Sequence, residues 1–378
     1  NTNRDSWSYN SDRNKLVDKM HQMVSVYNKQ VKLYSLNKDK SISVTELIEN
    51  DEKKIKWSSS LISNLERLNV AKFEKDRVLV SMYRPFFKQF LYFGDKMIHR
   101  RGQFEEIFPE PNVTNLMLCV SGLGGTKENS VVLTNCITDL NFLDAGTQCF
   151  PLYYFVKNDT INRSLFDSDS DNLQLKYSRK DGITNFVLKQ AIDLYGKKVA
   201  KEDIFYYIYG ILNNNEYRSR FANDLKKMFP RVPLLDEPKV FWAFSKAGRE
   251  LADLHLNYET VKPAEVRVTG TESEFYTVEK MRFPSKADKS TILFNSKIKI
   301  EGIPAEAYEY IVNGKSAIEW IMERYQVTTN KDSGIKNDPN DWAEEVGNPR
   351  YILDLLLSII TVSLETVRIV KSLPKLKF

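Results

Sequence analysis

The sequence is poor in cysteine, histidine, glycine and proline, and each shortage excludes a class of protein. Its three cysteines, Cys119, Cys136 and Cys149, lie 17 and 13 residues apart and form no C-x-x-C pair. An odd number of cysteines in a chain of 378 residues favours reduced thiols and predicts a cytoplasmic location. The three histidines include no i, i+4 pair, so we expect no metal site. With 15 glycines and 13 prolines, the chain is neither collagen-like nor of low complexity.

Long hydrophobic runs and a strong net charge are also missing. The best candidate for a membrane span, residues 352–364, carries Asp354 and is shorter than the roughly 20 apolar residues that cross a bilayer. No signal peptide is present, so we expect no membrane partner. The chain begins with Asn1 instead of methionine, which indicates a piece of a longer protein. The net charge of +5 does not by itself indicate a nucleic-acid partner.

The residues that are present suit a folded protein, and their pattern changes along the chain. Hydrophobic residues make up 42% and charged residues 28%, which excludes wholesale disorder. We predict an α+β fold with a β-rich central part flanked by helical segments at both ends. The predicted divisions are a helical segment over residues 1–72, a β-rich part over 73–180, a helical part over 181–260 and a strand-plus-helix part over 261–378.

Several elements are predicted in detail. Apolar stripes at helical spacing run through Leu16, Met20, Met23, Tyr27, Val31 and Tyr34, through Leu61, Leu65 and Leu68, and through Ile204, Ile208, Ile211 and Leu212. Another runs through Tyr217, Phe221, Leu225 and Met228, and Ser245 is predicted to cap a later helix. Short apolar runs at residues 78–80, 90–93, 116–120, 131–133 and 149–156 predict strands, and residues 158–171 predict a polar loop. Helix starts are predicted at a capping box over residues 316–319 and at the Asx-Pro pairs of residues 338–339 and 348–349.

Motifs for catalysis are absent. The glycine-rich residues 121–127 match neither a phosphate-binding loop nor a dinucleotide fingerprint, because Lys127 follows Thr126 and precedes Glu128. A turn between two strands is the better interpretation. Residues 348–351 approach the base-gripping loop of amino-methyltransferases, but Arg350 replaces its second proline. Neither a G-x-S-x-G elbow nor the paired acids of nucleases occur, so we expect no catalytic residue.

Local charge is the clearest positive feature. Residues 72–101 contain eight Lys or Arg against three acidic residues, and several aromatic residues lie among them. Lysine and arginine bind phosphates, and arginine also reads guanine edges in the major groove. A solvated strand face above a buried one explains the same pattern. On residue types alone, both interpretations stay open.

Ordered motifs along the chain resemble one family. Residues 3–10, the Tyr83-Arg84-Pro85-Phe86 segment and residues 146–154 resemble signature segments of type ISP restriction-modification enzymes. Similar segments occur at residues 120–122, 205–212, 217–218, 313–321, 324–327 and 338–342. In this family one polypeptide carries a nuclease, a DNA-translocating helicase motor, an adenine methyltransferase and a C-terminal specificity domain. The chain resembles that specificity domain, with residues 1–72 resembling the end of the methyltransferase region or a linker.

The resemblance implies a DNA target-recognition domain that reads an asymmetric duplex site and positions an adenine for methylation by another domain. It implies that this fragment is not an enzyme by itself and holds no cofactor. The parent protein would be a restriction endonuclease, helicase and adenine methyltransferase that uses S-adenosylmethionine, ATP and Mg²⁺ in defence against phage. The partners would be double-stranded DNA and the methyltransferase and motor domains of the same polypeptide.

Ten residues are predicted to contact DNA: Arg77, Arg84, Lys88, His99, Arg100, Arg101, Lys127, Gln148, Lys286 and Lys289. Arg84 has a rival role, because a residue inside a shared signature can serve the fold or touch the DNA backbone. Phe87 and residues 98–101 depart from the family pattern, in the region where readers of different sites should differ. Two alternatives stay open: a degenerate adenine-specific DNA methyltransferase fragment that binds the methyl donor, and an interdomain module that binds only protein.

Overall fold

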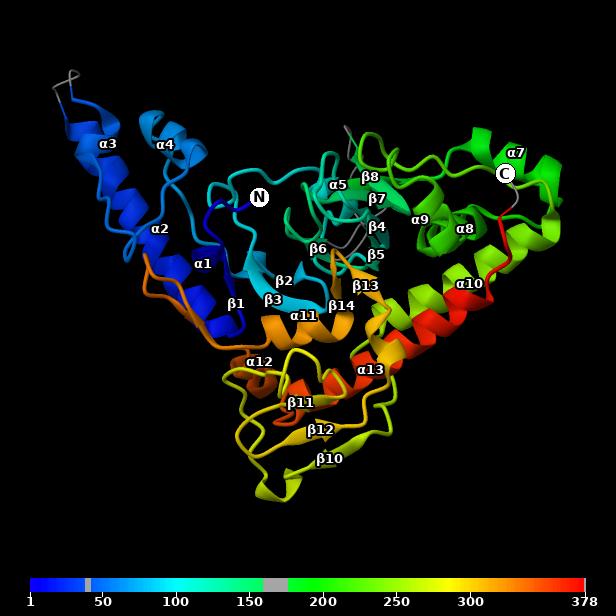
Figure 1. Ribbon diagram of the computed structural model, residues 1–378. Coiled ribbons are helices and arrows are strands. Elements are labelled where there is room, and N and C mark those ends of the chain that lie inside the picture. Colours follow the sequence, from blue (N-terminus) through cyan, green and yellow to red (C-terminus); the bar gives the residue numbers. More distant parts are fainter. Residues whose placement is uncertain (38–41, 159–175, 377–378) are drawn as a thin grey trace, which may run out of the picture. The chain divides into compact units, whose positions relative to one another are not determined.

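The computed structural model describes residues 1–37, 42–158 and 176–376, which form two compact units (Figure 1). Unit 1 contains residues 1–102, 263–305 and 318–360, and unit 2 contains residues 103–262, 306–317 and 361–378. Both units combine helices with small antiparallel sheets, which confirms the predicted α+β fold. The predicted polar loop lies outside the described residues from residue 159 on. Within the described part of the chain, no helix is long and apolar enough to cross a membrane.

The N-terminal part of unit 1 is helical, with α1 (Asp5–Ser8), α2 (Arg13–Leu36), α3 (Val44–Leu47) and α4 (Ser59–Glu66). The Asp12 carboxylate caps α2 by accepting a hydrogen bond of 2.8 Å from the backbone N–H of Lys15. The predicted stripe of α2 is buried from Leu16 to Val31. In α4 the prediction for Leu68 is wrong. The helix ends at Glu66, and Leu68 adopts a φ of +57° so that Asn69 N donates back to Asn64 O, a closure typical of helix C-termini.

A small antiparallel sheet follows these helices. It contains β1 (Tyr9–Asn10), β3 (Phe87–Tyr92) and β2 (Val78–Arg84) side by side in that order, with the 3-10 helix η1 (Lys75–Arg77) before β2. The predicted strands at residues 78–80 and 90–93 are confirmed. A tight turn with Phe86 at a φ of +59° joins β2 to β3. Along β3, Phe87, Gln89 and Leu91 are buried, whereas Lys88 is half-buried.

The C-terminal part of unit 1 contains a second sheet in the order β10 (Arg267–Thr269), β12 (Lys299–Glu301) and β11 (Thr291–Leu293), with the 3-10 helix η2 (Thr271–Ser273) after β10. Then come α11 (Ala317–Arg324), the hairpin of β15 (Thr328–Thr329) and β16 (Lys336–Asn337), α12 (Asn340–Glu345) and α13 (Tyr351–Ser372). Of α13, the residues up to Ile360 belong to unit 1 and those from Thr361 belong to unit 2. Helix α11 begins directly after Ser316, as predicted. Helices α12 and α13 begin one and two residues after their prolines. Asp338 accepts a hydrogen bond of 3.1 Å from the N–H of Asn340, the first residue of α12, and Asn348 accepts one of 2.9 Å from the N–H of Arg350, the residue before α13.

The described residues of unit 2 form three small sheets. The first has the order β5 (Val131–Thr134), β4 (Met117–Val120) and β7 (Gln148–Pro151). The other pairs are β8 (Tyr153–Lys157) with β9 (Tyr177–Asp181) and β13 (Ile311–Val312) with β14 (Lys315–Ser316). Shorter elements are α5 (Phe104–Ile107), β6 (Ile137–Thr138) and η3 (Ala305–Tyr308), of which η3 begins at the boundary of unit 1. The strands predicted at residues 116–120, 131–133 and 149–156 are confirmed.

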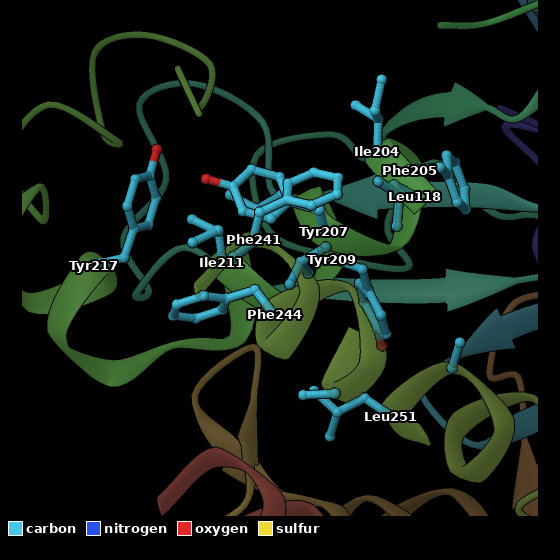
Figure 2. Close-up of a cluster of buried hydrophobic side chains, with 14 of the residues drawn as sticks. Leu118, Ile204, Phe205, Tyr207, Tyr209, Ile211, Tyr217, Phe241, Phe244 and Leu251 are labelled. Carbon is cyan, nitrogen blue, oxygen red and sulfur yellow. The ribbon is translucent and has the colours of Figure 1, made fainter. Parts of the chain in front are cut away.

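The core of unit 2 lies where helices pack on these strands. The helices are α7 (Asn185–Tyr195), α8 (Lys201–Asn213), α9 (Asn215–Arg220) and α10 (Pro238–Leu256). Figure 2 shows the aromatic residues of α8 and α10 gathered with Leu118 of β4. The Tyr207 and Phe241 rings lie 4.8 Å apart, and both side chains are fully buried.

Two predictions about these helices are wrong. The stripe from Tyr217 to Met228 is not one helix: α9 ends at Arg220, the following residues form turns, and Met228 is exposed. Ser245 does not cap a helix, because α10 begins seven residues earlier at Pro238, which supplies the preferred residue for the first helical turn. Instead, Ser245 is buried inside α10, and its hydroxyl donates a 2.9 Å hydrogen bond to the carbonyl of Asp203.

Helices α8 and α10 approach so closely that their crossing requires glycine. A Cβ atom built on Gly248 would lie 1.9 Å from the carbonyl oxygen of Tyr206, and one built on Gly210 would lie 2.4 Å from that of Phe244. Both obstacles are backbone atoms, so they cannot rotate away. The pair of glycines therefore sets the spacing of the two helices that carry the aromatic core.

A buried polar chain also ties α10 to α13 within unit 2. The Tyr209 hydroxyl lies 2.5 Å from His255 Nδ1, and His255 Nε2 lies 2.9 Å from the Thr366 hydroxyl. The His255 ring stacks on Tyr310 at 5.0 Å. Burial lowers the pKa of His255 to about 3, so the ring stays neutral and exchanges hydrogen bonds without bringing a charge into the core.

Replacing Gly248 with alanine tests the helix crossing. We expect Gly248→Ala to destabilise unit 2 by about 1–3 kcal/mol, because the added methyl group forces α8 and α10 apart. Urea unfolding followed by tryptophan fluorescence measures the change. Lys246→Ala is the control on the same helix, since 80% of the Lys246 side chain is exposed; it should change the free energy of unfolding by less than about 0.5 kcal/mol. Equal effects of the two changes would contradict the close crossing.

Candidate nucleic-acid interface

The basic window of unit 1 divides into exposed and inward-facing cations. Arg100 is exposed and has no ion pair among the described residues, and its backbone is fixed by two hydrogen bonds with Asn1, of 2.8 and 2.9 Å. Arg101 instead donates to the Phe93 carbonyl at 2.9 Å, lies over the Phe93 ring and pairs with Asp95. Of these two neighbouring arginines, Arg100 is therefore the one available to a ligand.

The contacts of the Arg84 side chain are mainly with residues of its own unit. Its guanidinium lies 3.9 Å from the centre of the Tyr83 ring, donates to the Tyr83 carbonyl and is 3.9 Å from the Asp5 carboxylate. Only 12% of the side chain is exposed. This position agrees with a role in the fold, the rival that the sequence left open for Arg84.

The remaining predicted residues of unit 1 are spread over several elements. Arg77 ends η1 and Lys88 lies on β3, both half-buried. His99 Nδ1 is 2.9 Å from the Ser60 hydroxyl, and burial, with a smaller effect of the Arg100 charge, lowers the pKa of His99. This shift favours the neutral ring, whose nitrogens exchange hydrogen bonds and carry no charge. Lys286 is exposed in the loop before β11, whereas Lys289 in the same loop pairs with Glu319 at 2.9 Å.

In unit 2 a carboxylate shapes the glycine-rich turn. Asp144 Oδ2 accepts hydrogen bonds from the backbone N–H groups of Thr126 and Lys127, at 2.7 and 2.9 Å. These bonds, that from Lys127 above all, lower the pKa of Asp144. A Cβ atom on Gly122 would lie 2.0 Å from the carbonyl oxygen of Ala145, so the turn needs glycine where it crosses this segment. The turn, predicted as a connection between strands, joins β4 to β5.

Two predicted DNA contacts border this turn. The Lys127 side chain is exposed and has no ion pair within the described part of the chain. Gln148 is exposed at the start of β7, where it lies opposite Val120, the last residue of β4 before the turn. Its side-chain N–H donates to the Gly146 carbonyl at 3.2 Å, which leaves the amide oxygen for an outside donor. The structure therefore brings a cation and an amide to one end of the first sheet of unit 2.

The sequence analysis missed a second basic segment beside the turn. The backbone N–H of Gly124 donates to the carbonyl of Lys226 at 2.9 Å, so residues 226–229 lie against the turn. Lys226 and Lys227 are exposed without ion pairs among the described residues, and the Phe229 ring lies 6.0 Å from the exposed Phe150 of β7. In the sequence, the Lys226-Lys227 pair is the signal for this segment, and the expectation of one helix over residues 217–228 conceals it.

We call this group the basic-aromatic surface of unit 2, and its members are Lys127, Gln148, Phe150, Lys226, Lys227 and Phe229. Cations, an amide and exposed aromatic rings are the groups that bind phosphates, base edges and base faces. In the described residues, no group of three or more His, Cys, Asp or Glu could hold a metal ion. The residue types of this surface are thus suited to binding a nucleic acid.

Comparisons with known proteins cover almost the entire chain. The family model for the type ISP C-terminal specificity domain matches residues 1–355. No curated protein matches the sequence. Among solved structures, the chain is similar to a nuclease-deletion mutant of the type ISP restriction-modification enzyme LlaGI in complex with a DNA substrate mimic, with 35% identity and a TM-score of 0.84. The match covers 99% of this chain and 32% of the LlaGI chain.

Two further structures show the same relationship. The ATP-dependent type ISP enzyme LlaBIII bound to DNA is 35% identical with a TM-score of 0.85, covering 100% of this chain and 23% of that one. The DrdV–DNA complex is 29% identical with a TM-score of 0.83, covering 100% of this chain and 35% of that one. The chain therefore spans about a quarter to a third of the length of the proteins it resembles.

The role of Asp144 can be tested by amide hydrogen exchange. We expect Asp144→Ala to speed exchange at Thr126 and Lys127 about tenfold or more, because both N–H groups lose a charged acceptor. Asp193→Ala is the control, since Asp193 is exposed on α7 without an ion pair among the described residues. The pKa of Asp144 is lowered by folding, so its contribution to stability is present above its ordinary value and is lost as the pH falls through the lower folded value. Protection that disappears at pH 5 would contradict this assignment.

Proposed function

This chain belongs to the family of type ISP C-terminal specificity domains, and from this membership we propose that it recognises a sequence in double-stranded DNA. The observation that carries the proposal is the likeness to three DNA complexes, which cover 99 to 100% of the chain at 29 to 35% identity. This likeness extends over both units of the chain. The elements that would meet DNA in this chain are the two groups of exposed cations described above.

The finer proposal concerns the site and the reaction it serves. The chain reads an asymmetric duplex site and positions an adenine for methylation by another domain of the same polypeptide. The parent protein then acts as a restriction endonuclease, helicase motor and adenine methyltransferase, and S-adenosylmethionine, ATP and Mg²⁺ belong to those other domains. LlaBIII is described as ATP-dependent, which supports the motor.

The chemistry of the basic-aromatic surface supports direct reading. Lys127, Lys226 and Lys227 have ammonium groups without ion pairs among the described residues, so binding a phosphate breaks no salt bridge. The Gln148 amide can bind a base edge in the major groove, and the turn that carries Lys127 is fixed by Asp144. In unit 1, Arg100 and Lys286 are suited to phosphate contacts for the same reason.

Salt dependence of DNA binding tests the surface of unit 2. In the combined variant Lys127→Ala, Lys226→Ala and Lys227→Ala, the slope of log K against log salt should fall in magnitude by about two to three, because each lost phosphate contact removes about 0.9. The matched control replaces Lys189, Lys197 and Lys198, which are exposed in unit 2 on α7 and in the turn after it. It removes the same charge and should leave the slope nearly unchanged. If both triple variants give the same slope, the surface is wrongly assigned.

Single variants separate the two neighbouring arginines of unit 1. Arg100→Ala should reduce the slope by about one without changing the unfolding temperature. Arg101→Ala should lower the free energy of unfolding by about 1 kcal/mol, because it removes the contacts with Phe93. Titration of a duplex at two salt concentrations and thermal unfolding measure the two effects. An unchanged slope in Arg100→Ala removes this residue from the interface.

A further inference from the structure

We propose that a pocket of unit 1 binds a single nucleobase, supplied either by DNA that has one base out of the stack or by a free nucleoside. The pocket has a volume of about 360 Å³, near the lower end of the range for small-molecule sites of about 300–1,000 Å³. It is lined by three parts of unit 1: the segment of α1 and β1, the hairpin of β2 and β3, and the segment from the end of α11 through β16. Two of these parts contain the motifs at residues 3–10 and 83–86, whose aromatic and acidic residues the DNA-contact assignment did not use.

A chain of hydrogen bonds fixes the polarity of two amides in the pocket wall. The backbone N–H of Ser11 donates to Asn337 Oδ1 at 3.1 Å. A backbone N–H can only donate, so the Asn337 oxygen must face Ser11. Gln89 then presents its nitrogen to the same oxygen, with a donor–acceptor distance of 2.8 Å, and also lies 3.3 Å from the Ser11 hydroxyl.

This arrangement leaves one acceptor and one donor unused. Both side chains line the pocket, and Gln89 is only 3% exposed. Among the described residues, neither Gln89 Oε1 nor Asn337 Nδ2 has a hydrogen-bond partner. An accessible amide oxygen and an amide nitrogen without protein partners can each bind a ligand or water. The pocket wall therefore presents the amide oxygen of Gln89 as an acceptor and the amide nitrogen of Asn337 as a donor.

Nucleobases are the ligands that such a wall fits. Every base carries a hydrogen-bond donor next to an acceptor on one edge, and amide side chains pair with these edges. The aromatic residues Tyr9, Tyr83 and Phe87 line the same pocket and supply apolar surface for the faces of a flat ring. The Tyr9 and Tyr83 rings lie 4.6 Å apart, and Tyr83 is held by its hydroxyl donating to Asp5 at 3.2 Å. The pocket is thus shaped before a ligand arrives.

The charges of the lining select a neutral group over a phosphate. Asp5 and Glu323 contribute two carboxylates, and Arg324 contributes one guanidinium that pairs with Glu323 at 2.6 Å. A phosphate in the pocket would face both carboxylates, whereas a base carries no charge at neutral pH. The sugar and phosphate of a bound nucleotide therefore stay outside. The part of the proposal that concerns DNA rests on the proposed function, whereas the nucleoside part does not.

The first experiment uses the 378-residue chain and free nucleosides. Saturation-transfer NMR with thymidine, deoxyadenosine, deoxycytidine and deoxyguanosine should show stronger transfer to base protons than to sugar protons. Asn337→Asp changes only the group that faces the pocket, because the remaining oxygen still accepts from Ser11 and Gln89. We expect it to weaken nucleoside binding at least about fivefold with no loss of the folded state by circular dichroism. Asn112→Asp is the control, which adds the same charge at an exposed position outside the pocket.

The second experiment asks whether DNA can supply the base. A duplex with one bulged 2-aminopurine is compared with the fully paired duplex, because an unpaired base leaves the stack at low cost. The chain should bind the bulged duplex about fivefold more tightly or better, and Asn337→Asp should abolish this preference while leaving the affinity for the paired duplex unchanged. If Asn337→Asp leaves the affinity for the paired duplex unchanged, binding of the paired duplex does not depend on the pocket.

The possible results separate the two proposals. Binding of nucleosides through their bases, with loss in Asn337→Asp, supports the pocket even if no duplex binds, in which case the proposed function fails alone. Absence of nucleoside binding overturns the pocket even if the paired duplex binds. Binding of N-acetylglutaminamide in place of nucleosides identifies a peptide site and also overturns it.

Discussion

The basic-aromatic surface depends on one interaction, in which a carboxylate accepts hydrogen bonds from two successive backbone N–H groups. Asp144 holds the turn after β4 in one shape, and that shape places Lys127 in solvent and Gly124 against the carbonyl of Lys226. Without this anchor the turn would have to order itself when a ligand binds, which reduces affinity. The rigidity of the surface thus comes from a residue that does not itself touch the proposed ligand.

A count of basic residues along the sequence overstates how many of them are available to bind a partner. Residues 72–101 hold eight basic residues, but Arg84 and Arg101 are occupied by aromatic rings, carbonyl groups and carboxylates of their own unit. Arginine suits such internal roles, because its flat guanidinium stacks and donates at the same time. Among the described residues, the charged groups of Arg100, Lys127 and Lys226 have no ion pair. Arg100 therefore differs from Arg84 and Arg101 in its position and not in its residue type.

Local pattern predicted much of the fold and little of the sites. The stripes of α2 and α8 follow from helical periodicity, and the strands β2 to β5 follow from short apolar runs. In β4 and β5 every residue is buried, which explains why these runs are continuous. Family resemblance supplied the function, which no single motif carried. The contact of Gln89 with Asn337 joins residues 248 positions apart, and that of Gly124 with Lys226 joins two loops. Such pairs depend on tertiary packing, so neither spacing nor composition predicts them.

The chain path through unit 2 bears on how a new specificity can arise. Every member of the basic-aromatic surface lies in the single uninterrupted stretch of residues 103–262, although unit 2 also takes residues 306–317 and 361–378. One gene exchange with breakpoints near Gly102 and Pro263 would therefore transplant the whole surface at once. The recipient would keep Tyr310 and Thr366, so an incoming segment must still offer them a histidine like His255. An exchange of the proposed reading surface thus also exchanges the histidine that contacts Tyr310 and Thr366.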